Sequence, residues 1–202
     1  MKLDTKVTKT TLFLLLLVVT PPFFSALHLP VLGKTLLDSV EFLQVLGLIF
    51  GGVLTLCWIK KNPLQQSTKI FWYWSVIWWL TLAGRSASWG RDYFPEEPHW
   101  LFRGISVVLI AALLVPLFFP MMRKVIAQQW KKSTLPIIPF VIAAVSFLCS
   151  DIVEHHRILS NVLLYDAAYQ DITEELFENA LILGLLYISV QMMRDEVSTR
   201  QA

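Results

Sequence analysis

Carboxylates and histidines gather where they could bind a metal ion. Asp151, Glu154 and His155 stand at i, i+3 and i+4, so they share one face of a helix. Glu178 lies in the following apolar segment, and Glu41 lies in an earlier one. Carboxylate oxygens and imidazole nitrogens are ligands of zinc and other divalent first-row ions. The first hypothesis is therefore a divalent metal site, zinc for example, formed by Asp151, His155, Glu178 and Glu41.

Arginines accompany these carboxylates and suit a different ligand. A guanidinium group binds a carboxylate or phosphate bidentately, so it could hold an anionic lipid head group. Arg85 and Trp89 stand at i and i+4 and could stack. A charge inside a membrane span costs about 2.5–3.5 kcal/mol on insertion scales, so an interhelical salt-bridge network is the alternative. The residues in this ligand or ion-pair set are Arg85, Arg103, Arg91, Glu154, His156, Glu175 and Asn179.

Three functions stay open for this polar set. A metal-bound water, with a spare carboxylate as general base, would make the chain a membrane-embedded hydrolase. A site for an ion or a head group would make it a binding protein. A pure ion-pair network would fit a non-catalytic membrane subunit of a larger assembly. A haem between His28 and His155 is disfavoured, because both histidines lie at the outer ends of their segments rather than well inside a helix.

The composition indicates that lipid is the solvent. Of the 202 residues, 55% are hydrophobic and 16% are charged, whereas about a quarter are charged in soluble domains. The mean hydropathy is +0.59. The net charge of +2, without a basic stripe or a binding motif, excludes nucleic acid as an expected partner. The expected partners are the lipid bilayer, an anionic lipid or small ligand, and a protein partner or a second copy of the chain.

Six apolar segments approach the length of about 20 residues that crosses a membrane as a helix. They predict an all-α membrane helix bundle, with residues 1–202 in a single integral membrane domain. Pro21 and Pro22 interrupt the first segment. We expect an uncleaved anchor there, because Phe24 stands where cleavage near Ala26 requires a small residue. The segments are roughly Thr11–Leu29, Leu36–Ile59, Ile70–Ser88, Leu101–Met122, Leu135–Asp151 and Glu174–Met193.

The lysines and arginines predict that both termini are cytoplasmic. Cytoplasmic loops carry an excess of these residues, and here twelve lie at one set of span ends against five at the other. We therefore expect an inner (plasma) membrane protein whose polar set faces the non-cytoplasmic side. The twelve are Lys2, Lys6, Lys9, Lys60, Lys61, Lys69, Arg123, Lys124, Lys131, Lys132, Arg194 and Arg200, and the five are Lys34, Arg85, Arg91, Arg103 and Arg157.

Local patterns predict how the segments begin and pack. The sequences 35–38 (Thr-x-x-Asp) and 171–174 (Asp-x-x-Glu) resemble capping boxes that open helices. The aromatic run Phe71–Trp74 fits a belt at the inner interface. The glycines at 47, 51 and 52 favour close helix packing or a contact between copies of the chain.

Overall fold

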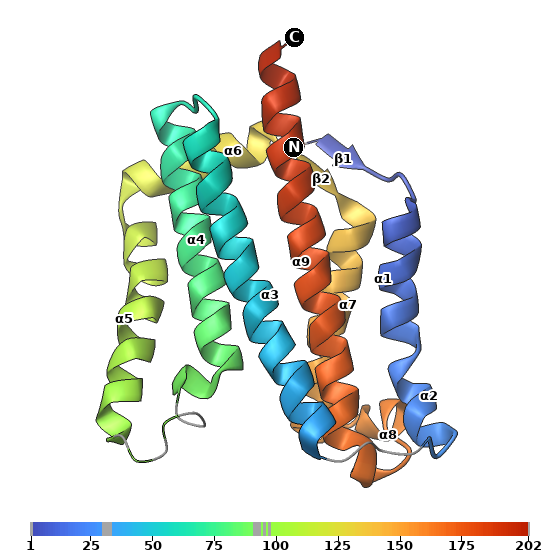
Figure 1. Cartoon of the computed structure of the whole chain (residues 1–202). Helices are drawn as coiled ribbons and strands as arrows, with labels where there is room; N and C mark the ends of the chain where they lie inside the picture. The colour runs from blue at the N-terminus through green and yellow to red at the C-terminus, as the bar shows by residue number, and fades with distance from the viewer. Residues whose placement is uncertain (1, 30–33, 91–93, 95, 97, 202) are drawn as a thin grey trace. The chain divides into compact units, whose positions relative to one another are not determined.

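The computed structural model describes residues 2–29, 34–90, 94, 96 and 98–201, and only the backbone of residues 2, 34 and 199–201. The described chain is helical over most of its length, which confirms the predicted all-α class (Figure 1). Its contacts divide it into two compact units. We call Glu41–Ser133 the central unit, and Met1–Val40 with Thr134–Ala202 the terminal unit. The expected single domain stays a prediction, since two compact units can belong to one domain.

The terminal unit joins the two ends of the chain. The strands β1 and β2 pair in parallel, with Lys2 opposite Thr134, so the start of the chain lies beside the segment that leads into α7. This sheet was not predicted from the sequence. Helix α9 packs most extensively on α7, and α1 also lies against both (Figure 1). The elements are β1 (Lys2–Asp4), α1 (Lys9–Val19), α2 (Pro21–Ala26), β2 (Thr134–Pro136), α7 (Ile137–Glu154), α8 (Ser160–Leu163), η2 (Ala167–Tyr169) and α9 (Gln170–Gln201).

Small side chains bring α7 and α9 close together. A Cβ atom placed on Gly184 of α9 would lie 3.0 Å from the Cβ atom of Ala143 on α7. Ser146 and Ala180 are fully buried. Such small residues allow close backbone approach, which drives helix association in membranes. Farther along, Val153 and Phe177 are completely buried in a cluster that closes this end of the unit.

The first apolar segment is a packed part of the terminal unit. Thr8 caps α1 in a capping box with Thr11, and its hydroxyl lies 3.2 Å from the hydroxyl of Tyr187 on α9. The proline pair starts α2 and separates it from α1, as the sequence predicted. Ser25 of α2 is fully buried and accepts a hydrogen bond of 3.1 Å from the backbone amide of Tyr165.

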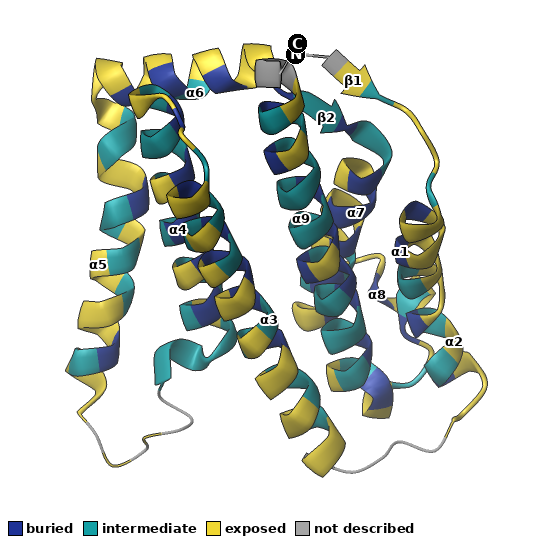
Figure 2. Cartoon of the chain, turned by 45° about the horizontal axis from the view of Figure 1, so that its top comes forward, coloured by how far each residue is buried: buried dark blue, intermediate teal, exposed yellow. Residues whose placement is uncertain are grey.

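The central unit contains three long helices and one that crosses their ends. Figure 2 shows α6 running across the ends at which α4 begins and α5 finishes. Helix α6 is amphipathic, because Met122, Val125 and Gln129 are buried while Lys124 and Lys131 are exposed. The elements are α3 (Lys34–Lys61, in this unit from Glu41), α4 (Gln66–Ser86), η1 (Ser88–Gly90), α5 (His99–Phe118) and α6 (Pro120–Lys132).

The aromatic residues of α4 pack inside the central unit. Trp72 is 2% exposed and makes an edge contact with Trp58 of α3, with ring centroids 5.0 Å apart. A Cβ atom on Gly51 would lie 2.8 Å from the ring of Trp79, which confirms the expected close packing for this one of the three glycines. The prediction that Trp72 belongs to an aromatic belt at the membrane interface was wrong, because its ring is buried between helices.

Within the described residues, five helical segments are long and apolar enough to cross a membrane. Helix α4 has 21 residues, a length of about 30 Å at 1.5 Å per residue, but its polar and aromatic residues lower its hydropathy. Of the six membrane spans predicted from the sequence, five correspond to these segments. That α4 crosses the membrane stays a proposal. The five are Lys9–Ala26, Thr35–Lys61, His99–Phe118, Ile137–Glu154 and Ala167–Ser198.

Some predicted helix ends were wrong. The fourth segment was expected to reach Met122, but α5 ends at Phe118 and Pro120 begins α6. Proline favours the first turn of a helix, because its missing amide is not needed there. Thr35 and Asp171 lie inside α3 and α9, so neither is the N-cap that a capping box requires. Asp166 instead caps η2 by accepting a hydrogen bond of 2.9 Å from the amide of Ala168.

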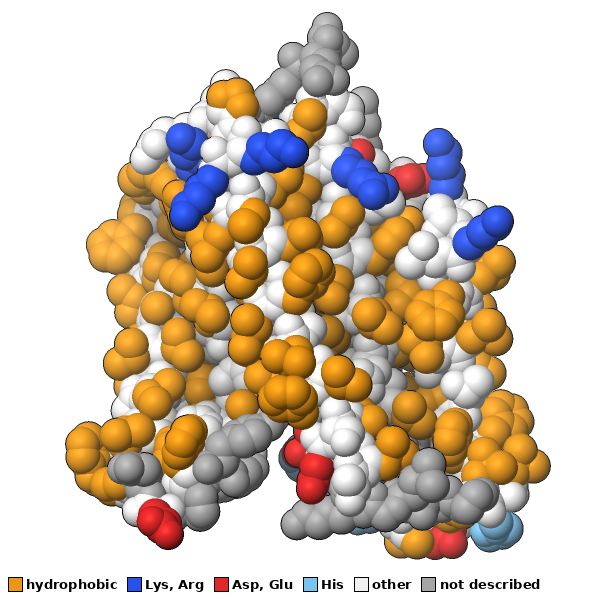
Figure 3. Space-filling model, in the orientation of Figure 1, with side chains coloured by type: hydrophobic (Ala, Val, Ile, Leu, Met, Phe, Trp, Pro, Cys, Tyr) orange, Lys and Arg blue, Asp and Glu red, His pale blue; other side chains and the backbone are white. Residues whose placement is uncertain are grey.

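The surface agrees with a lipid environment. Figure 3 shows hydrophobic side chains over the middle of the helices in each of the two units. Several large apolar side chains of α5 face outward, and Val108 and Phe118 are 66% and 80% exposed. Exposed apolar patches of this extent are rare on soluble monomers.

Candidate functional site

A pocket of about 300 Å³ lies in the central unit where α4 ends and α5 begins. His99 and Arg103 stand four residues apart on α5, so their side chains project from the same helical face. Among the described residues, the lining combines a guanidinium group, an imidazole, two hydroxyls and two aromatic rings, without a carboxylate. The lining residues are Ser88, Trp89, His99, Phe102, Arg103 and Ser106.

A strained turn forms one wall of this pocket. After α4 ends at Ser86, the residues Ser88, Trp89 and Gly90 all have positive φ angles, of 47°, 59° and 96°. Holding a residue other than glycine in this left-handed backbone conformation costs about 1–3 kcal/mol of folding free energy. Such strained residues occur often at ligand sites. The amide of Gly90 donates a hydrogen bond of 2.7 Å to the carbonyl of Ala87, which holds the turn closed.

The ring of Trp89 is folded back over Gly84 of α4. A Cβ atom at Gly84 would lie 2.8 Å from Cε3 and Cζ3 of that ring, so only glycine leaves room for it. The helical i, i+4 relation predicted for Arg85 and Trp89 is therefore wrong, because α4 ends at Ser86 between them. Trp89 is fixed by the turn and by Gly84, and it forms a rigid side of the pocket.

Arg103 is the cation that this pocket offers to a ligand. Its side chain is exposed and, within the described part of the chain, makes no hydrogen bond or ion pair. A guanidinium group presents several donors in one plane and matches phosphate and carboxylate geometry. No acidic side chain among the described lining residues neutralises this arginine.

The other predicted polar residues of the central unit have different roles. Gln44 is 3% exposed and accepts a hydrogen bond of 3.4 Å from the hydroxyl of Ser86. Glu41 and Arg85 both have interaction partners. Arg91 lies outside the described residues. The structure therefore leaves Arg103, rather than Arg85, as the candidate ligand-binding arginine.

In the terminal unit, Asp151 is bound by an arginine. Arg157 donates from Nε to one carboxylate oxygen at 2.8 Å and from the NH2 group to the other at 3.1 Å. His155 lies nearby, with its Nδ1 atom 3.5 Å from Asp151 and 3.6 Å from Glu154. The arginine and histidine side chains are more than half exposed. Asp151, Glu154 and His155 therefore form a cluster at the surface, as their spacing predicted, with Arg157 as an added member.

The end of α7 explains why Arg157 reaches Asp151. His156 has a φ angle of 47°, and its amide donates to the carbonyl of Val153 at 3.3 Å. The amide of Arg157 donates to the carbonyl of Ile152 at 3.1 Å. These two bonds form a Schellman motif, in which the left-handed residue ends the helix and reverses the chain. His156 therefore has a backbone role here.

Glu178 contacts the neighbouring helix α7, whereas Asn179 bonds within its own helix, α9. The buried hydroxyl of Ser150 on α7 donates to Glu178 at 3.5 Å. The Asn179 amide donates to the carbonyl of Glu175 in the same helix at 2.9 Å. Among the described residues, no group of three or more His, Cys, Asp or Glu side chains is placed to hold a metal ion. The metal site of Asp151, His155, Glu178 and Glu41 stays a prediction, and it combines residues of both units.

No family model, no curated protein and no solved structure matches this chain. The function must therefore be inferred from the side chains themselves. His99 and Arg157 were not predicted from the sequence as members of polar clusters. The four-residue spacing from His99 to Arg103 was a usable signal, whereas the contact of Arg157 depends on the backbone reversal at His156.

Proposed function

We propose that this chain is a multi-pass protein of the plasma membrane that binds the anionic head group of a lipid in the pocket around Arg103. One observation carries the proposal, namely that this pocket presents an arginine without a partner among the described residues. His99 and the two serines add donors around the same space. A volume of about 300 Å³ suits a head group, since small-ligand pockets begin at about this size.

The position of the pocket at a helix end favours a lipid as the ligand. Helix α5 is apolar from Leu101 to Phe118 apart from Arg103, Gly104 and Ser106, so the pocket would lie at the edge of the hydrocarbon layer. In that position a head group can bind to the arginine while its acyl chains stay in the bilayer. The lysine excess at the α6 end would place the pocket on the non-cytoplasmic face.

A second candidate function follows from the terminal unit. The Asp151–Arg157 pair and the Schellman ending are a structural arrangement that fits a non-catalytic subunit of a larger membrane assembly. A guanidinium group at 2.8 Å already neutralises the Asp151 carboxylate, which opposes recruitment of a cation there. The geometry therefore supports head-group binding over metal-dependent hydrolysis.

The test compares lipid binding by two arginine variants. Native mass spectrometry of the full chain would count phosphatidylglycerol and phosphatidylcholine molecules retained by the wild type, by Arg103→Gln and by Arg123→Gln. Arg123 is an exposed arginine of α6 outside the pocket, so its variant controls for total charge. We expect about tenfold weaker phosphatidylglycerol binding for Arg103→Gln alone, as for loss of one charged hydrogen-bonding group.

Two results would contradict this function. Equal losses for Arg103→Gln and Arg123→Gln would show that the lipid responds to surface charge and not to the pocket. A stoichiometric metal ion in the purified wild type, lost in His155→Ala, would support the metal hypothesis instead.

A further inference from the structure

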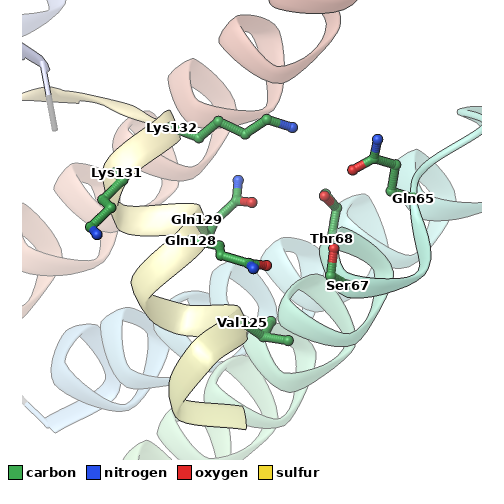
Figure 4. Close-up of a pocket in the computed structure, with 8 residues that line it drawn as sticks. All are labelled: Gln65, Ser67, Thr68, Val125, Gln128, Gln129, Lys131 and Lys132. Carbon is green, nitrogen blue, oxygen red and sulfur yellow. The ribbon is translucent and has the colours of Figure 1, made fainter. Parts of the chain in front are cut away.

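A second pocket, of about 450 Å³, lies at the other end of the central unit, between the start of α4 and helix α6. Figure 4 shows side chains from both helices pointing into the same space. The described lining residues are polar except for Val125, and none of them is a carboxylate. The residues are Gln65, Ser67, Thr68, Val125, Gln128, Gln129, Lys131 and Lys132.

This end of the central unit is strongly basic. The sequence has no Asp or Glu between residues 42 and 91 or between residues 98 and 133. Among the described residues of the central unit, the charged side chains around this pocket are therefore all cationic. These cations favour an anion in the pocket. The cations are Lys60, Lys61, Lys69, Arg123, Lys124, Lys131 and Lys132.

The hydroxyl of Thr68 is the feature of this pocket that most specifically indicates a ligand. It is 3% exposed, and within the described chain its hydroxyl has no hydrogen-bond partner. Thr55 and Thr81 instead donate to the carbonyl four residues earlier, at 2.7 and 2.8 Å. For Thr68 that residue is Leu64, which precedes the helix. Figure 4 shows the Thr68 hydroxyl directed into the pocket.

The backbone and the opposite wall suit an anion as well. Gln65 is the N-cap of α4 but makes no side-chain capping bond, so the positive end of this helix faces the pocket without an acidic cap. Across the space, the Gln129 side chain is 4% exposed and donates to the hydroxyl of Ser133 at 3.3 Å. Figure 4 shows Lys132 reaching over the pocket, whereas Lys131 points away from it.

We propose that this pocket binds a phosphate group, with the Thr68 hydroxyl, the start of α4 and Lys132 as its donors. Lysines alone would be expected at any cytoplasmic membrane face, where they fix orientation. Orientation requires neither a cavity nor an unpartnered hydroxyl of a largely buried threonine in its lining, and these two features distinguish a binding site from a retention signal. The phosphate belongs either to an anionic phospholipid or to a free ion.

The experiment uses the full chain in phosphatidylcholine nanodiscs, with and without phosphatidic acid, and separately with inorganic phosphate. Binding is measured as the shift of the thermal unfolding midpoint. Thr68→Val removes the hydroxyl with little change in volume, and Thr81→Val on the same helix is its control. We expect about tenfold weaker binding in Thr68→Val, the loss of one hydrogen bond to a charged group, and wild-type binding in Thr81→Val.

Two lysine variants distinguish binding in the pocket from general attraction to the basic surface. Lys132→Gln should weaken binding more than Lys124→Gln, which changes an exposed α6 lysine outside the lining. A response to phosphatidic acid alone identifies a lipid, and a response to inorganic phosphate identifies a free ion; either supports the site. No response to either probe, wild-type binding in Thr68→Val, or equal losses in both lysine variants would overturn it. Binding at the Arg103 pocket is tested separately with Arg103→Gln, because that substitution leaves the lining of the Thr68 pocket unchanged.

Discussion

Replacing Gly51 by alanine should destabilise the central unit. A Cβ atom at this position would lie 2.8 Å from Cδ2 and 2.9 Å from Cε2 and Cε3 of Trp79. Carbon atoms pack at about 3.5–4.0 Å, so three contacts would be too short at once. Trp79 is 5% exposed, which leaves its ring little room to move. Overpacking of this kind costs about 1–3 kcal/mol.

The neighbouring glycine provides a matched control. At Gly52 an added Cβ atom would lie 3.5 Å from Cβ of Trp79, which is ordinary contact. Alanine is favoured over glycine in a helix by about 0.8–1.0 kcal/mol, and this gain is common to both substitutions. Gly51→Ala should therefore be less stable than Gly52→Ala by the overpacking cost alone, about 1–3 kcal/mol.

The assay is unfolding of the purified variants in detergent, followed by tryptophan fluorescence. In a Trp79→Leu background the difference between the two alanine variants should vanish, because the ring that Cβ meets is gone. Equal stabilities of Gly51→Ala and Gly52→Ala with Trp79 present would refute the packing of α3 on α4 described here.

Three further predictions follow from single contacts. Gly84→Ala should displace the Trp89 ring, seen as a shift in tryptophan emission, and should weaken phosphatidylglycerol binding in native mass spectra. Asp151→Asn should lower the unfolding free energy by less than about 1 kcal/mol in denaturant titration, because its arginine partner is 58% exposed. Trp74→Phe should cost about 1–3 kcal/mol in the same titration, since it removes the indole that donates to the Leu113 carbonyl at 3.2 Å.

Hydropathy and charge predicted most of the helices but not how each helix ends. Apolar length alone located the segments, because a membrane helix must bury about 20 residues in lipid. Helix α6 was missed, since its apolar residues alternate with lysines and form only a stripe. The pairing of β1 with β2 was also unforeseen, because strands of three residues carry no periodic signal.

The candidate site was predictable only where residues are close in sequence. The Asp151–His155 contact follows from helical spacing and was expected. The pocket around Arg103 was not, because its wall depends on left-handed residues at Ser88 and Trp89, which have no sequence signature without glycine at those positions. The Thr68 pocket was missed for a related reason, since it requires α6 to fold across the start of α4.

The outward position of the Arg103 pocket depends on whether α4 crosses the membrane. This helix is long enough but is not among the five segments apolar enough to span by composition. If it crosses, the two pockets of the central unit open on opposite faces. The most direct test truncates the chain after Lys61 or after Ser88, which lie before and after α4, and fuses a topology reporter to each end. We predict a cytoplasmic signal after Lys61 and a non-cytoplasmic signal after Ser88; signals on the same side at both positions would contradict this arrangement.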